Sequence, residues 1–180
     1  MKLIILESDG VINQWPEKEI EAPDEWIPVA GSIKAMARLY QSGYTLVILT
    51  EQPGGGQGLE VLHAIYNRLN QLLEQFGGHI DAIFFCPHEA KDMCQCRQPV
   101  SGIYTEIAKR FQCELNGVPV VSDSLANIEV ANSAGAIPVL LKTGKENKLL
   151  SAVDSKLLKR IKVYNDLAEF SEAIILGTDK

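Results

Sequence analysis

Three cysteines and one histidine lie within eleven positions of the chain, at Cys86, His88, Cys94 and Cys96. Thiolate sulfur and imidazole nitrogen are ligands that zinc prefers, and four of them complete a closed tetrahedral shell. Such a shell leaves no coordination position for an activated water, so the pattern predicts structural rather than catalytic zinc. The alternative is unlinked buried cysteines beside a surface histidine. The clustering in one loop after an expected strand disfavours it.

Acidic and hydroxyl side chains follow several short apolar runs. In chain order they are Glu7, Ser8, Asp9, Thr50, Glu51, Ser122 and Asp123. Ligands of parallel α/β sheets bind beyond the carboxyl ends of the strands. We therefore look for a functional site where these side chains gather, although solvated acids at a sheet edge are the default explanation for such residues.

Apolar runs alternate with segments of helical spacing along nearly the whole chain. We expect strands at Lys2–Leu6, Thr45–Leu49, Ile80–Phe85, Val118–Val121 and Ile137–Leu141, with an edge strand at Ile161–Tyr164. We expect helices at Ser32–Ser42, from a glycine-rich turn (54–58) to about Phe76, and at Val100–Phe111, Leu125–Ala134 and Asp166–Leu176. This alternation predicts an α/β fold with a parallel sheet covered on both faces. The polar segment Thr143–Ser155 is expected on the surface.

Length and composition limit the class of protein. The 180 residues suit one domain spanning 1–180, and 46% hydrophobic with 22% charged residues is ordinary globular composition. A net charge of −6 argues against nucleic acid or an anionic membrane as partner. The first residues are too short an apolar run for a signal peptide, and no stretch approaches the ~18 residues that span a bilayer. We expect a cytoplasmic monomer. Cys113, outside the cluster, is expected to pack, as are Trp15 and Trp26 in a lid or core.

Four segments together resemble one family. They are Asp9–Asn13, Pro23–Trp26, the cysteine loop through Arg97, and Leu141–Lys145. They resemble the D-glycero-D-manno-heptose 1,7-bisphosphate 7-phosphatases of the haloacid dehalogenase superfamily, and related histidinol-phosphate phosphatases carry a similar zinc loop. The resemblance covers Leu3 to about Leu176. It implies a three-layer α/β/α haloacid dehalogenase-like domain with a zinc-binding loop and no large cap.

The resemblance also implies roles for the residues at the strand ends. In the family an Asp after the first strand attacks phosphorus, and an Asp two residues later is the general acid and base. A hydroxyl and a Lys hold the phosphoryl oxygens, and an Asp after the fourth strand helps to bind magnesium. Asp9 matches the acid/base, Thr50 the hydroxyl and Asp123 the magnesium position, whereas Arg97 matches a residue facing the substrate. Glu7, Asp9 and Asp123 are the magnesium candidates.

Several positions depart from the family pattern. Glu7 stands at the nucleophile position, Gln98 at the clamp lysine, Ser8 at an arginine, Glu51 and Gln57 at an asparagine and an arginine near the substrate, and Asn127 at a second aspartate. The extra methylene of Glu displaces its carboxylate by about 1 Å, which can cost roughly 100-fold in a preorganised site. Loss of one electrostatic stabiliser commonly costs roughly 100- to 1,000-fold.

These departures lead us to predict a catalytically impaired or inactive relative that keeps the fold and the zinc. Magnesium binding should be weak, and the protein would bind or regulate, with a small phosphorylated sugar or a protein as partner. The alternative is an active magnesium-dependent phosphatase acting on a phosphorylated sugar such as heptose 1,7-bisphosphate. It would use Glu7 as nucleophile, or Asp9 with an activated water. A purely structural partnership is a third hypothesis.

Overall fold

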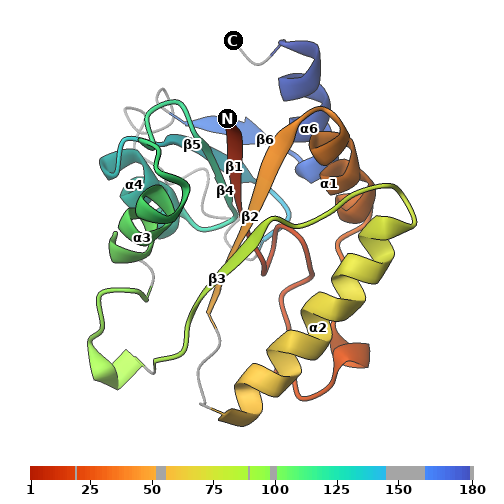
Figure 1. Ribbon diagram of the computed structural model, residues 1–180, viewed down its shortest axis with the longest axis vertical. Coiled ribbons are helices and arrows are strands. Elements are labelled where there is room, and N and C mark those ends of the chain that lie inside the picture. Colours follow the sequence, from red (N-terminus) through yellow and green to blue (C-terminus); the bar gives the residue numbers. More distant parts are fainter. Residues whose placement is uncertain (19, 52–55, 89, 98–100, 145–160, 179–180) are drawn as a thin grey trace.

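The computed structural model describes residues 1–18, 20–51, 56–88, 90–97, 101–144 and 161–178 (Figure 1). Six strands in these ranges form one sheet in the order β3-β2-β1-β4-β5-β6, and every neighbouring pair is parallel. The strands are β1 (Lys2–Glu7), β2 (Tyr44–Glu51), β3 (Ala82–Cys86), β4 (Pro119–Ser122), β5 (Ile137–Leu141) and β6 (Lys162–Tyr164). The predicted parallel sheet, with an edge strand near the C-terminus, is confirmed.

Helices cover both faces of this sheet. They are α1 (Ser32–Gln41), α2 (Gly56–Glu74), α3 (Gly102–Phe111), α4 (Leu125–Ser133) and α6 (Leu167–Leu176), with 3-10 turns η1 (Pro23–Glu25) and η2 (Ala90–Asp92). Helices α1, α2 and α6 pack on one face, and α3 and α4 pack on the other (Figure 1). The arrangement is the predicted three-layer α/β/α domain.

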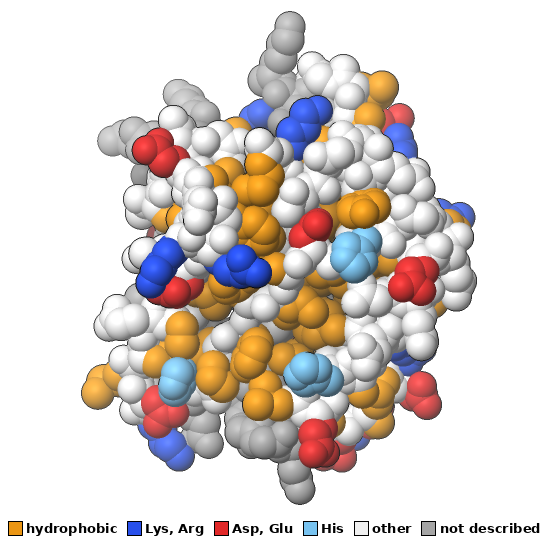
Figure 2. Space-filling model, in the orientation of Figure 1, with side chains coloured by type: hydrophobic (Ala, Val, Ile, Leu, Met, Phe, Trp, Pro, Cys, Tyr) orange, Lys and Arg blue, Asp and Glu red, His pale blue; other side chains and the backbone are white. Residues whose placement is uncertain are grey.

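The central strand β1 has an apolar core on each side. Ile4 and Leu6 belong to the core under α1, α2 and α6, whereas Leu3 and Ile5 belong to the core under α3 and α4. Successive side chains of a strand point to opposite faces, so a strand covered on both sides must be apolar throughout. The edge strand β3 is only half-buried before Cys86. Hydrophobic side chains are visible along the middle of the face of the molecule that Figure 2 shows.

Some boundaries differ from those predicted. Strand β3 begins at Ala82 rather than Ile80, because the carboxylate of Asp81 accepts a hydrogen bond from Leu46 N (2.8 Å) just before the ladder. Helix α2 begins at Gly56, inside the expected glycine turn, and residues 52–55 lie outside the described ranges. Most of the polar segment 143–155 also lies outside them. None of the described helices is long and apolar enough to cross a membrane.

Parallel pairing fixes the geometry of the sheet edge that carries the site. Strand β1 lies between β2 and β4, with Glu7 opposite Leu49 of β2 and Leu6 opposite Val121 of β4. Residues that follow these strands therefore emerge at one edge. The expectation that the strand-end residues share one edge of the sheet is confirmed.

Candidate metal centre and strand-end site

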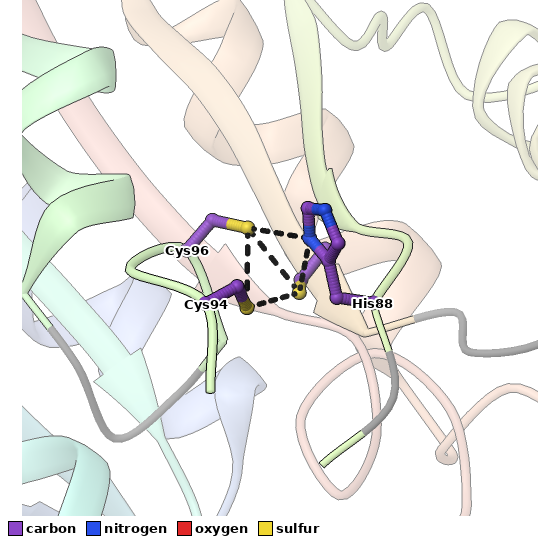
Figure 3. Close-up of side chains that lie close together, drawn as sticks. His88, Cys94 and Cys96 are labelled. Atoms are coloured by element: carbon purple, nitrogen blue, oxygen red, sulfur yellow. Dashed lines mark hydrogen bonds between the residues drawn. The ribbon is translucent and has the colours of Figure 1, made fainter. Parts of the chain in front are cut away.

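The cysteine loop brings four metal-ligating atoms together (Figure 3). Cys86 ends β3, the other three residues follow in the loop, and all four ligand atoms lie within 4.8 Å of one another. The three sulfurs are 3.4–3.5 Å apart, and Nδ1 of His88 is 3.2 Å from the Cys96 sulfur. Ligands about 2.3 Å from a tetrahedral zinc ion stand roughly 3.8 Å apart, so the residues fit such an ion.

The thiols of this cluster differ in acidity. Burial raises the pKa of the Cys86 thiol to about 12. At Cys94 burial also opposes ionisation, but hydrogen bonds from the backbone N–H of Cys96 and from the neighbouring thiols lower the pKa to about 7. A metal ion must therefore displace a firmly held proton from Cys86, while Cys94 gives up its proton readily. Arg97 braces the loop because its Nη1 donates to the carbonyl of His88 (2.9 Å).

At the end of β1 the carboxylate of Glu7 is buried, with 5% of the residue exposed. Its Oε2 accepts a hydrogen bond from Ser122 Oγ at 2.6 Å and another from Asn127 Nδ2 at 3.2 Å. Both donors come from β4 and the start of α4. The carboxylate oxygen at the nucleophile position is therefore held toward β4 by neutral donors.

The turn after β1 is held by a chain of side-chain hydrogen bonds. Asn13 Nδ2 donates to Asp9 Oδ1 (2.8 Å), and Ser8 Oγ donates to Asn13 Oδ1 (2.8 Å). Tyr66 of α2 reaches the same turn, with its hydroxyl 3.4 Å from Ser8 Oγ. Burial raises the pKa of Tyr66 to about 12, although hydrogen bonds to Ser8 and Thr50 act against this rise. Tyr66 therefore joins the ends of β1 and β2.

Asp123, directly after β4, is enclosed. It is 3% exposed, and its Oδ2 accepts a hydrogen bond from the indole N–H of Trp15. Gly10 and Gly144 pack so closely against the carboxylate that a β-carbon at either position would overlap it. The hydroxyl of Thr143 donates to the carbonyl of Gly10, which ties the loop after β5 to the turn after β1.

Not every predicted site residue can be placed. Thr50 is buried near the end of β2, where the sequence predicts it. Glu51 is the last residue of β2 and Gln57 lies in the first turn of α2, but their side chains lie outside the described part of the chain. Gln98 lies outside it altogether. The catalytic and substrate-binding roles of these residues stay predictions.

Sequence reasoning did not foresee the contacts of three residues in the site. Tyr66 is one member of an ordinary helical apolar face. Only its hydroxyl, which needs a hydrogen-bond partner when buried, indicates a contact with the site. Asn127 departs from the family pattern, but its residue type does not indicate that it donates to Glu7. Trp15 was expected to pack in a lid or core, yet it is 40% exposed and contacts Asp123.

Comparison with known proteins identifies the family. The family model described as polynucleotide kinase 3 phosphatase matches residues 5–165. The D-glycero-beta-D-manno-heptose-1,7-bisphosphate 7-phosphatase of Bordetella bronchiseptica is 43% identical over 178 residues, which cover 97% of this chain and 98% of that protein. This chain belongs to the heptose-1,7-bisphosphate 7-phosphatase family.

Other members of the heptose-bisphosphatase family extend the match. The protein of the same name from Neisseria meningitidis serogroup A is 40% identical over 181 residues, covering 97% of this chain and 95% of its own. The B. bronchiseptica D,D-heptose 1,7-bisphosphate phosphatase, complexed with magnesium and phosphate, superposes with a TM-score of 0.91 at 43% identity and covers 98% and 99% of the two chains. The Burkholderia thailandensis enzyme gives a TM-score of 0.74 at 33% identity, with coverages of 97% and 99%. The predicted family and haloacid dehalogenase-like fold are confirmed.

For magnesium, the family comparison and the local contacts point in opposite directions. The B. bronchiseptica relative is described with magnesium and phosphate, so the comparisons taken alone favour an active, magnesium-dependent phosphatase. Nothing in them indicates a loss of activity, and the predicted impairment rests on the residues of this chain. Here the oxygens Glu7 Oε2 and Asp123 Oδ2 each face a hydrogen-bond donor. Magnesium requires oxygen ligands in near-octahedral geometry, and in this arrangement these two oxygens are engaged by donors instead.

Proposed function

We propose that this member of the heptose-bisphosphatase family is impaired or inactive in phosphoryl transfer, and that it keeps its fold and a structural zinc ion for a binding or regulatory role. The observation that supports this most is the pair of hydrogen bonds that Ser122 and Asn127 donate to Glu7. A nucleophilic oxygen must reach phosphorus at about 3–3.5 Å along the line of attack. Oε2 accepts two hydrogen bonds from β4 and α4, which engage its lone pairs and make it a weaker nucleophile.

The charges of the site support the same conclusion. Glu7, Asp9 and Asp123 contribute carboxylates, whereas Ser8 and Gln98 stand where the family resemblance expects cations. Two unit charges about 4 Å apart interact by about 4 kcal/mol at an effective dielectric constant of 20. A phosphate dianion that meets carboxylates without the usual cations is therefore repelled by several kcal/mol.

The zinc ion would act on structure. Its ligands span the connection from β3 to α3, and Gly102 at the start of α3 packs directly on the carbonyl of Gln95 in the loop. Binding of structural zinc contributes folding free energy, so the ion would fix the loop and the start of this helix together. A zinc site built of three thiols also suits a reducing compartment, and we place the protein in the cytoplasm.

The partner we propose is a small phosphorylated sugar bound without turnover, or another protein. The net charge of −6 argues against nucleic acid and anionic membranes, and a monomer is expected. Calorimetric titration of heptose 1,7-bisphosphate into the zinc-loaded protein tests the sugar directly. Binding without phosphate release supports this role, and the absence of any heat shifts the proposal to a protein partner, sought by co-purification.

A second candidate is an active magnesium-dependent phosphatase that hydrolyses heptose 1,7-bisphosphate. The full-length similarity to the B. bronchiseptica enzyme, with its TM-score of 0.91, favours this candidate. Glu7 would then attack phosphorus and Asp9 would protonate the leaving oxygen, or Asp9 would activate water directly. On the first route Glu7 would attack with Oε1 or release the donors on Oε2, and on the second route it takes no direct part.

Phosphate release distinguishes the two candidates. Zinc-loaded protein is incubated with magnesium and heptose 1,7-bisphosphate, and wild type is compared with Glu7→Asp/Gln98→Lys. We expect wild type near background and a gain of roughly 100-fold or more in the double variant, because a positioned nucleophile and a clamping cation are restored. Robust wild-type turnover that disappears in Asp9→Asn would overturn the proposal in favour of the phosphatase.

A further inference from the structure

The loop after β1 places an indole against the carboxylate that the family resemblance assigns to magnesium. Trp15 donates its N–H to Oδ2 of Asp123, a residue 108 positions later in the chain. We infer that Trp15 closes Oδ2 of Asp123 to divalent cations and so weakens the binding of a metal ion at this site. The inference deepens the proposed function and rests on it.

The chemistry of the indole makes this contact exclusive. The indole nitrogen is a donor and carries no lone pair for a metal, so Trp15 cannot become a ligand. Its N–H points at Oδ2, so a cation on Oδ2 requires the indole to leave, and the other oxygen, Oδ1, is itself buried. Gly10 and Gly144 pack against the same carboxylate, which is 3% exposed. The approach to Oδ2 is thus controlled from the side of Trp15.

The backbone beside Trp15 is anchored while its side chain has room. Gln14 N donates to the carbonyl of Ile27 (2.8 Å), and Asn13 bridges to Pro28 in the segment before α1. The indole stands between two open hollows of about 410 and 440 Å³. These hollows and its 40% exposure give the indole space outside the core. Trp26, by contrast, is 1% exposed within the core.

Manganese binding tests the inference independently of activity. Zinc-loaded wild type, Trp15→Phe and Trp15→Leu are titrated with Mn²⁺, and free Mn²⁺ is measured by electron paramagnetic resonance. Neither Phe nor Leu offers an N–H, so both variants should bind Mn²⁺ roughly 10- to 100-fold more tightly than wild type, in line with the loss of a hydrogen bond to a charged group. The gain must disappear when Asp123→Asn is added to either variant.

Ile27→Ala serves as the matched control, because Ile27 lines the same 410 Å³ hollow and is 53% exposed. It should bind Mn²⁺ as wild type does. Equal affinity of wild type and both Trp15 variants, with zinc content and circular dichroism unchanged, overturns the inference and leaves the proposed function standing. Wild-type Mn²⁺ affinity as tight as that of the variants overturns it too. Wild-type phosphate release overturns the proposed function instead, so the two failures are separable.

Discussion

The zinc loop and the strand-end site lie on neighbouring strands of one sheet, yet they differ in how much of the family pattern they keep. The loop has all four metal ligands, with their atoms within 4.8 Å of one another. The strand-end site keeps Asp9, Thr50 and Asp123 but has Glu7 and Gln98 where the family resemblance expects Asp and Lys. The loop keeps its full set of ligands, whereas the strand-end site departs from the family pattern at two of these positions.

The difference teaches what each site requires. A closed zinc shell contributes to folding, so removing any ligand destabilises the whole domain. The strand-end site can lack the expected cations and remain folded, because neutral donors satisfy its carboxylates. Ser122 and Asn127 satisfy Glu7, and Trp15 satisfies an oxygen of Asp123. Polar groups that are buried need partners, but the partners need not be catalytic.

Removing a zinc ligand should give the largest effect. We expect Cys94→Ser to lose most of its zinc, measured by atomic absorption, and to lower the free energy of unfolding by several kcal/mol, because metal binding is coupled to folding. Cys113→Ser is the matched control, since Cys113 is half-buried in the core under α3 and α4 and lies outside the cluster. It should keep its zinc. Stoichiometric zinc in Cys94→Ser would contradict the ligand assignment.

Alkaline pH should lower the stability of the fold through Tyr66, which contacts the strand-end site. Burial raises the pKa of Tyr66 to about 12, so between pH 10 and pH 12 the unfolded chain releases this proton while the folded chain retains it. Stability must fall with rising pH in that window, by about 3 kcal/mol for a shift of two pKa units. Tyr66→Phe should lack this fall.

Urea unfolding of wild type and Tyr66→Phe at pH 9 and pH 11.5 measures this difference. Tyr40→Phe is the control, because Tyr40 is 37% exposed at the surface of α1 and should unfold as wild type does at both values of pH. Parallel pH profiles of wild type and Tyr66→Phe would show that the Tyr66 hydroxyl is not buried as described. The proposed contact between α2 and the turn after β1 would then be wrong as well.

The fold was largely predictable because each of its signals is local. Apolar runs of strand length gave β1, β2 and β5, and the spacing of four ligands gave the cysteine loop. The start of β3 was missed because the side chain of Asp81 bonds to the backbone of Leu46, a contact between residues distant in sequence. The ends of the helices differ from the predicted ends by one or two residues.

The contacts within the strand-end site were beyond prediction from sequence. Which donor faces Glu7 depends on where α4 begins relative to β4, and the sequence indicates only that Asn127 is near. The contact of Trp15 with Asp123 joins residues 108 positions apart through a loop without a periodic pattern. Residue types at the strand ends indicate which family positions are substituted, whereas three-dimensional packing decides which groups contact the substituted residues.

Asn127 gives the smallest expected effect among the tests that compare the zinc loop with the strand-end site. It is a neutral donor where the family resemblance expects a second acid. Asn127→Ala removes the donor 3.2 Å from Glu7 Oε2 and leaves a buried carboxylate with one hydrogen bond fewer. We expect a loss of about 1.5 kcal/mol, the low end for a hydrogen bond to a charged group at this length. Asn132→Ala on the same helix matches the gain in helix propensity. Chemical denaturation of the two variants should separate them by that amount. Equal stability would mean that Glu7 is not held by α4, and its carboxylate could then turn toward a substrate as an active phosphatase requires.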